Sequence, residues 1–264
     1  MIGQKHIREF IDLNVDKLPH FIVLIGDKGG GKRTLAKYIA EKLGATYSEV
    51  GIKVDDVREV VDTSSLSATK VLYCFADADN MRPEAKNAML KITEEAPDNA
   101  YFVLTVVNEK SLLDTIKSRA FVFKMETYTT EELEEYIKFK SYPEGNSLML
   151  ASTPYDIDML YLYGAEFFDY VHLVLDNIAE VEPANAFKSS SKLNIKNEEG
   201  YDLVLFLKTI RFFLLNEMFK AEDKTKYANA MLVTSKHIGK LSEMSANKQQ
   251  VYDSWVFKIR EALI

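Results

Sequence analysis

Cysteine is almost missing from this sequence of 264 residues, in which Cys74 is the only one. A single cysteine excludes an internal disulfide and any zinc site built from several cysteines of one chain. No run of residues approaches the roughly 20 apolar positions that a membrane-spanning helix needs. The N-terminus also lacks a charged segment followed by an apolar one, the pattern that directs export. We therefore expect a cytoplasmic protein.

An excess of positive charge is missing as well. The chain has 33 lysines and arginines against 40 acidic residues, which gives a net charge of −7. This net negative charge argues against a protein that binds nucleic acid over its whole surface, although it is compatible with a local basic stripe. The hydrophobic fraction of 47% is that of an ordinary globular protein. A chain of this length can form two or three small domains.

The most informative stretch is a glycine-rich turn after the apolar run 21–25. Its glycines are Gly26, Gly29, Gly30 and Gly31, and Lys32 follows them at the spacing G-x-x-x-x-G-K. Glycines of this kind let backbone N–H groups converge, and the following helix presents its N-terminus to an anion. We expect a phosphate-binding loop. If ATP or ADP binds there, Lys32 is placed to contact the β-phosphate, and in ATP also the γ-phosphate.

One position of this loop departs from the pattern. Arg33 stands where a serine or threonine should hold magnesium. Its charge would repel the ion, and Thr34 lies one residue too late, about 100° round the helix. We therefore expect Mg²⁺ binding to be weak or absent, while nucleotide binding stays an open question.

A second departure concerns the acids after the apolar run 71–75. A nucleoside triphosphatase needs a carboxylate at the strand end for the magnesium shell, and usually a neighbouring one to activate water. The candidate pair here is Ala76-Asp77, or Asp77-Ala78 in the other register, and each lacks one acid. Alternatively, the acids only cap the following helix. Together with Arg33, this loss predicts poor hydrolysis.

Helical and apolar patterns alternate over the first 125 residues, which indicates βαβ crossovers and a parallel sheet. The expected strands are 21–25, 71–75, 101–107 and 121–123, and the expected helices are 1–18, 34–43, 52–61, 83–93 and 111–117.

Helical patterns dominate after residue 125. A capping box at Thr129 and Glu132 opens the first of them. Breaks at 143–145 and 152–154 delimit a small helical unit, and the polar stretch 180–200 predicts a linker or loop. Three further helices are expected at 201–220, 224–241 and 246–263. The predicted domains are therefore 1–126, 127–178 and 179–264.

Several short motifs occur in a distinctive order: Ile2-Gly-Gln4, Leu18-Pro-His20, the glycine-rich loop, Asp55-Asp56-Val57-Arg58, Asn87-Ala-Met-Leu-Lys-Ile-Thr-Glu94-Glu95-Ala-Pro97 and Thr115-Ile-Lys-Ser118-Arg119. In this order the chain resembles bacterial DNA polymerase III clamp-loader subunits of the delta-prime type, within the AAA+ superfamily. The resemblance covers about residues 1–125. It is weaker for 247–263, which is similar to the last helix of that family's collar.

This resemblance implies an α/β fold, in which an AAA+ P-loop domain with a parallel sheet precedes a small helical lid and an all-α collar domain. It also implies a place in a hetero-oligomeric ring with other clamp-loader subunits, which acts on a sliding clamp and on primed-template DNA. Ser118 and Arg119 match the family's Ser-Arg-Cys motif, with Ala120 in place of the cysteine. In that family the arginine acts in trans on a neighbour's nucleotide.

Other roles follow from the same resemblance. Asn108 occupies the family's sensor position, and Arg58 matches a position that faces template phosphates, although a solvated helix charge is the alternative. Zinc is not expected, since no cysteine lies between Gly44 and Val71, and the lid lacks the sensor arginine of active subunits. We therefore predict an ATPase-impaired subunit. Two alternatives stay open: an active motor that uses Asp77 and Thr34, or a P-loop-derived binding protein of another assembly.

Overall fold

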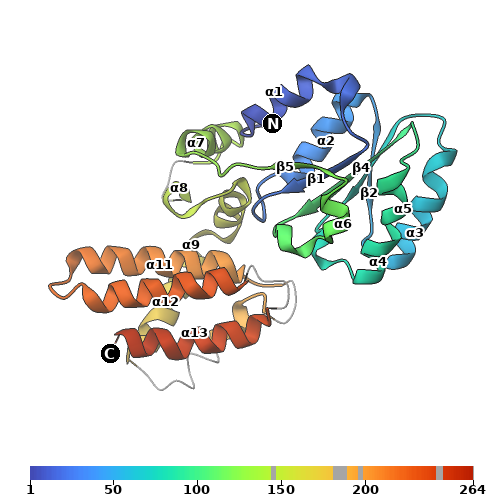
Figure 1. The fold of residues 1–264 in the computed structure, drawn as a ribbon. Coiled ribbons are helices and arrows are strands. Elements are labelled where there is room, and N and C mark those ends of the chain that lie inside the picture. Colours follow the sequence, from blue (N-terminus) through green and yellow to red (C-terminus); the bar gives the residue numbers. More distant parts are fainter. Residues whose placement is uncertain (144–146, 181–188, 196–198, 242–245, 264) are drawn as a thin grey trace. The chain divides into compact units, whose positions relative to one another are not determined.

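The computed structural model describes residues 1–143, 147–180, 189–195, 199–241 and 246–263 (Figure 1). The chain forms two compact units. The first comprises Met1–Pro143 with Ser152–Tyr155, and the second comprises Glu144–Ala151 with Asp156–Ile264. Among the described residues, no helix combines the length and the hydropathy that crossing a bilayer requires.

A parallel sheet lies at the centre of the first unit, as the alternating pattern predicted. Its strands are β1 (Phe21–Ile25), β2 (Thr46–Val50), β3 (Val71–Phe75), β4 (Ala100–Val106) and β5 (Phe121–Lys124). They are arranged in the order β2-β3-β4-β1-β5, and all neighbouring strands pair in parallel. The carboxyl ends of β1, β3 and β4 therefore meet at one edge of the sheet, where ligands of such folds bind.

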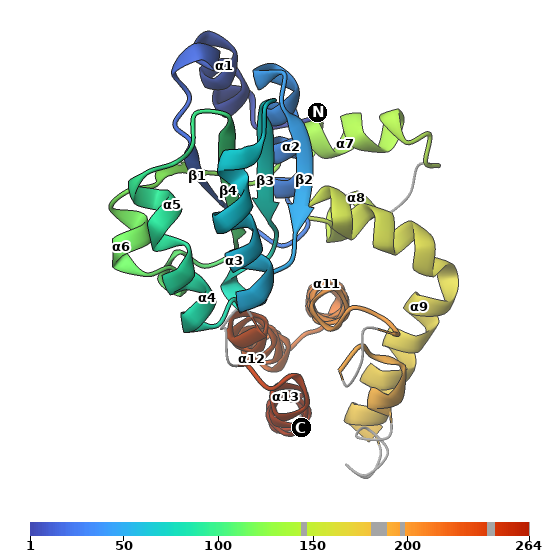
Figure 2. The same cartoon turned by 90° about the vertical axis from the view of Figure 1, so that its right-hand side faces the viewer.

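Both faces of this sheet are covered, which explains why its inner strands are apolar throughout. Successive side chains of a strand point to opposite faces. Thus Ile22 and Leu24 of β1 pack in one core cluster with Leu35, whereas Val23 packs in the other with Val57. The helices that follow β2 and β3 lie together on that second face (Figure 2).

The helices of the first unit are α1 (Lys5–Leu13), α2 (Lys32–Leu43), α3 (Val54–Thr63), α4 (Pro83–Ala88), α5 (Leu90–Glu94), α6 (Asp114–Lys117) and α7 (Thr130–Phe139). Three expectations were wrong in extent. The N-terminal helix begins only at Lys5, after a left-handed Gln4, and a separate 3-10 turn follows it. The helix expected at 83–93 is divided at Met89 into α4 and α5. The helix expected at 111–117 is a 3-10 turn, Glu109–Ser111, followed by α6.

The strand β2 is absent from the expectation. It lies at the edge of the sheet and carries Thr46, Ser48 and Glu49. An edge strand contacts only one neighbour and remains partly exposed, so its sequence can be polar and gives no apolar run. The capping box at Thr129 and Glu132 is present as expected and begins α7.

The second unit is helical. Its elements are α8 (Ser147–Leu150), most of α9 (Pro154–Glu180), a 3-10 turn (Ser189–Lys192), α11 (Leu203–Lys220), α12 (Thr225–Leu241) and α13 (Lys248–Leu263). The three C-terminal helices confirm the expectation to within a few residues. The expected linker lies mostly outside the described residues. In its described part, Leu193 pairs with Tyr201. Since α7 belongs to the first unit, the three-domain division with a lid at 127–178 stays a prediction.

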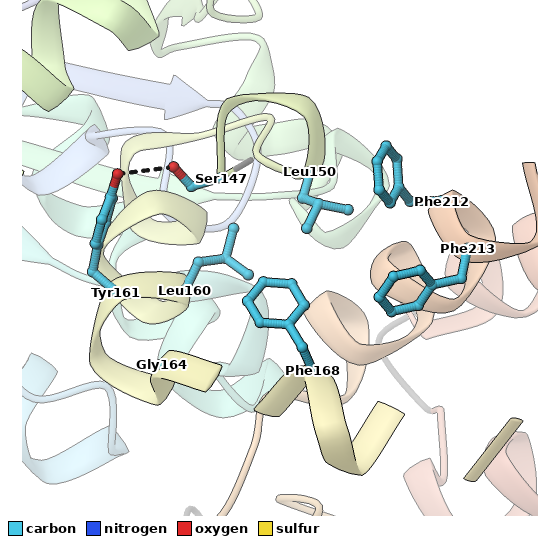
Figure 3. A pocket seen from close by; sticks show the side chains of 8 residues that line it. All are labelled: Ser147, Leu150, Leu160, Tyr161, Gly164, Phe168, Phe212 and Phe213. Carbon is cyan, nitrogen blue, oxygen red and sulfur yellow. Dashed lines mark hydrogen bonds between the residues drawn. The ribbon is translucent and has the colours of Figure 1, made fainter. Parts of the chain in front are cut away.

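A bend in α9 shapes an apolar pocket in the second unit (Figure 3). Gly164 interrupts the helix with φ of 62° and ψ of −156°. Beside it lies a cavity of about 310 Å³. A hydrogen bond of 3.1 Å joins Ser147 and Tyr161 at its wall. The other lining residues are Leu150, Leu160, Phe168, Phe212 and Phe213.

Candidate functional site

The glycine-rich loop joins β1 to α2 at the carboxyl edge of the sheet. The amide of Gly26 still donates to Val106 of β4, and the amide of Gly30 closes a turn by donating to Asp27. Gly31 then adopts φ of 85°, a conformation that favours glycine, and precedes the first residue of α2. The helix begins two residues earlier than expected, so Lys32 and Arg33 both belong to its first turn.

Lys32 is buried inside this loop, with only 7% of its surface exposed. Its ammonium donates to the carbonyl oxygens of Gly26 and Asp27, both at 2.8 Å. Burial lowers the pKa of Lys32, and the negative charges of Asp77, Asp79 and Asp27 oppose this shift. An ammonium has three N–H donors, so the loop carbonyls orient the group and leave a third donor for an anion.

Arg33 meets the acid at the end of β3. One guanidinium nitrogen lies 3.0 Å from a carboxylate oxygen of Asp77, and Nε lies 3.4 Å from Glu49. Both Arg33 and Asp77 are about half exposed. The backbone amide of Asp77 donates to the hydroxyl of Thr105, and this bond fixes the backbone at Asp77. The two positions that should share a magnesium ion therefore share an ion pair instead.

The fold family implies Mg²⁺ at this place, but the donors do not fit it. A divalent magnesium site requires oxygen ligands, and the position after Lys32 supplies a cation. The carboxylate of Asp77 is already bound to that cation. Thr34 is exposed and lies beyond Arg33 on the helix. The residues present therefore hold a positive charge where the metal would lie.

Asp79 has a different role from Asp77. Its side chain is 9% exposed. Its carboxylate accepts hydrogen bonds from the amides of Val107 (2.7 Å) and Asn108 (3.0 Å). It thus fixes the end of β4, rather than the start of the next helix. The side chain of Asn108 in turn accepts from the amide of Lys110. The sensor role of Asn108 stays a prediction.

Two tyrosines that the sequence did not single out lie against the loop. The hydroxyl of Tyr128 donates to the carbonyl of Gly30 at 3.0 Å. Tyr155 lies beside Gly29, where any Cβ would collide with it, and its ring faces the ammonium of Lys28. A cavity of about 290 Å³ flanks the loop between Gly26, Tyr128 and Thr153. Nothing local in the sequence marks these contacts, because they join residues about a hundred positions apart.

Arg119 lies elsewhere in the first unit. It precedes β5 by two residues, and Phe121 of β5 pairs with Ile22 near the start of β1. Because the strands are parallel, Arg119 lies at the amino edge of the sheet, whereas the glycine-rich loop lies at its carboxyl edge. Its guanidinium is 39% exposed and contacts Glu94 at 3.2 Å and the carbonyl of Thr115 at 3.1 Å.

The remaining predicted residues are placed on exposed surfaces. The hydroxyl of Ser118 donates to the carbonyl of Thr115. Arg58 lies on the exposed side of α3, opposite the buried Val57 and Val60. The structure thus gathers Gly26–Thr34 and Asp77 at one edge of the sheet. It keeps Arg119 apart from them, and the role of Arg58 stays a prediction.

Comparison with known sequences supports the resemblance. Residues 45–129 match the family described as DNA polymerase III, delta subunit. The chain is 28% identical over 181 residues to DNA polymerase III subunit gamma of Buchnera aphidicola, covering 56% of this chain and 50% of the relative. It is 33% identical over 105 residues to subunit delta' of Haemophilus influenzae, covering 39% and 32%. The chain thus spans about half or less of the length of the curated relatives it matches.

Comparison with solved structures supports the fold. A structure of Thermotoga maritima RuvB, described as a Holliday junction branch migration motor, is 16% identical with a TM-score of 0.51. The likeness covers 95% of this chain and 87% of that one. At this identity it shows the fold alone, which agrees with the predicted parallel sheet and helical C-terminal part.

Proposed function

Since the chain is related to the AAA+ clamp-loader subunits of DNA polymerase III, we propose that it is a delta-prime-like subunit with impaired ATPase activity. It takes its place in a hetero-oligomeric ring with other clamp-loader subunits. This assembly opens a sliding clamp and places it on primed-template DNA during replication in the cytoplasm. The match at residues 45–129 and the delta' relative support this choice of subunit.

The observation that carries the proposal is the ion pair between Arg33 and Asp77. Hydrolysis of ATP depends on a metal ion held by a hydroxyl and an acid, and on a second acid or equivalent group that orients water. In this chain Arg33 replaces the residue that should carry the hydroxyl, and its guanidinium is paired with the carboxylate of Asp77. No step of hydrolysis can therefore proceed efficiently at this loop.

The role left to this chain in ATP hydrolysis is carried by Arg119. An arginine placed in trans stabilises the charge that develops on a transferring phosphoryl group. The amino edge of the sheet, where Arg119 enters β5, is separated from the chain's own loop by the length of β1. Four residue steps of a strand span about 13 Å. Arg119 therefore serves a nucleotide bound to a neighbouring subunit.

The test is ATP turnover by the reconstituted complex. We expect Arg119→Ala to lower turnover at the neighbour's site by on the order of 10³-fold, the effect of removing such an arginine. Lys32→Ala should leave turnover nearly unchanged. A matched control is Lys117→Ala, which removes a cation two residues away whose partner is Asp114.

The opposite pattern would contradict the proposal. If Lys32→Ala abolished turnover while Arg119→Ala had no effect, the chain would be an active motor that hydrolyses ATP at its own loop. Failure of the chain to assemble with clamp-loader partners would favour a binding protein of another assembly.

A further inference from the structure

We propose, on the assignment of the glycine-rich loop to nucleotide made above, that this loop binds a nucleoside di- or triphosphate without a divalent cation. In this site the Arg33 guanidinium stands in place of the metal ion. The ligand is thus the free polyphosphate, not its magnesium complex.

The loop retains the groups that hold phosphate. Within the part of the chain that the structure describes, no side chain caps the N-terminus of α2, which begins directly after Gly31. The first N–H groups of a helix have no partner inside it, and they favour a negative charge. Lys32 adds a buried ammonium whose position is set by the carbonyls of Gly26 and Asp27. These features bind phosphate oxygens and require no metal.

The metal position, in contrast, is filled by protein charge. The Arg33 guanidinium lies 3.0 Å from Asp77 and 3.4 Å from Glu49. A magnesium ion would have to displace this guanidinium from Asp77 and remain close to it, against the repulsion of like charges. The site therefore gives Mg²⁺ no net electrostatic attraction, because the carboxylate of Asp77 is already paired with Arg33.

Arg33 has the chemistry to replace the ion at the phosphates. Its guanidinium presents five N–H donors in a planar fork that matches phosphate oxygens. Two of these donors account for the contacts with Asp77 and Glu49. Because the side chain is about half exposed, it can turn from these acids towards an incoming phosphate without crossing the core.

The experiment measures the Kd of the full chain for ADP and for ATP, in excess EDTA and in excess Mg²⁺. We expect a lower apparent Kd in EDTA than in excess Mg²⁺, because the ion withdraws free nucleotide into its magnesium complex. Arg33→Ser should raise Kd in EDTA by about tenfold, the effect of losing charge-assisted hydrogen bonds. The same variant should bind more tightly when Mg²⁺ is added, because a hydroxyl and a free Asp77 become available. Lys37→Ser, one turn further along α2, is the matched control.

A second variant distinguishes the two kinds of site by the direction in which Kd changes. Asp77→Asn removes a negative charge that competes for Arg33, so we expect a lower Kd in EDTA. In a magnesium site the same change removes a ligand of the ion and raises Kd in Mg²⁺. Any of three results would overturn the proposal: that rise in Kd, binding by the wild type only in Mg²⁺, or the lack of any nucleotide binding. None of these results bears on Arg119, whose role is read from turnover by the complex.

Discussion

Replacing Asp79 with alanine separates the structural acid of this site from the functional one. Asp77 and Asp79 are two positions apart and both follow β3. Yet Asp79 is buried and binds the amides of Val107 and Asn108, whereas Asp77 is half exposed and pairs with Arg33. We expect Asp79→Ala to destabilise the first unit far more than Asp77→Ala does.

The magnitude follows from the contacts that each variant loses. Hydrogen bonds to a charged group contribute about 1.5–3 kcal/mol each, and donors left buried without a partner add their desolvation penalty. Loss of both bonds in Asp79→Ala should therefore lower the free energy of unfolding by at least about 3 kcal/mol. Asp77→Ala breaks a solvent-screened pair, which is worth at most about 1 kcal/mol.

The assay is urea denaturation followed by far-ultraviolet circular dichroism, combined with amide hydrogen exchange at the end of β4. Trp255 lies in the second unit, so its fluorescence serves as the control that this unit is unchanged. In Asp79→Ala the amides of Val107 and Asn108 should exchange on the order of a hundredfold faster, as about 3 kcal/mol implies. Equal destabilisation by the two variants would refute the division of roles.

Two further predictions concern a buried histidine and an exposed arginine. Burial lowers the pKa of His237 below its usual value near 6.5, so folding favours the neutral ring. Its contribution to stability is therefore complete above pH 6.5 and is lost as the pH falls below that value, because the unfolded chain then binds the proton more readily. Denaturation at pH 7.5 and 5.5 checks this, and His237→Gln should reduce the difference. For Arg58, we expect Arg58→Ala to weaken binding of the complex to primed DNA equally for all sequences. It should also reduce the slope of log K against log salt by about 1, as measured by titration at several salt concentrations, whereas an unchanged slope would mean a merely solvated charge.

Local patterns were sufficient to predict much of the first unit. The edge strand β5 was predicted from its short apolar run, although Phe121 remains exposed. The strands β1, β3 and β4 are apolar runs because each is largely covered in the sheet, and burial on both faces removes the need for polar alternation. The edge strand β2 escaped prediction for the converse reason, since Thr46, Ser48 and Glu49 remain partly exposed. The division of helix 83–93 at Met89 has no signal in the sequence.

The candidate site shows the same contrast between local and distant relations. The spacing of Gly26, Gly31 and Lys32 is local, and it predicted the loop because glycine and lysine are required at short, definite intervals. The sequence also showed that Arg33 stands where a serine or threonine was expected. What the sequence left open was the partner of that arginine, the role of Asp79 and the tyrosines beside the loop.

Those relations depend on the strand order β2-β3-β4-β1-β5. That order places the ends of β1 and β3 at one edge, and so lets Arg33 reach Asp77, 44 positions away. It also places the start of β5 at the opposite edge, which separates Arg119 from the chain's own loop. The sequence by itself determined which chemical groups the chain carries and where its phosphate loop lies. The tertiary structure alone decided which charges meet, because contacts between distant residues are set by how strands pair.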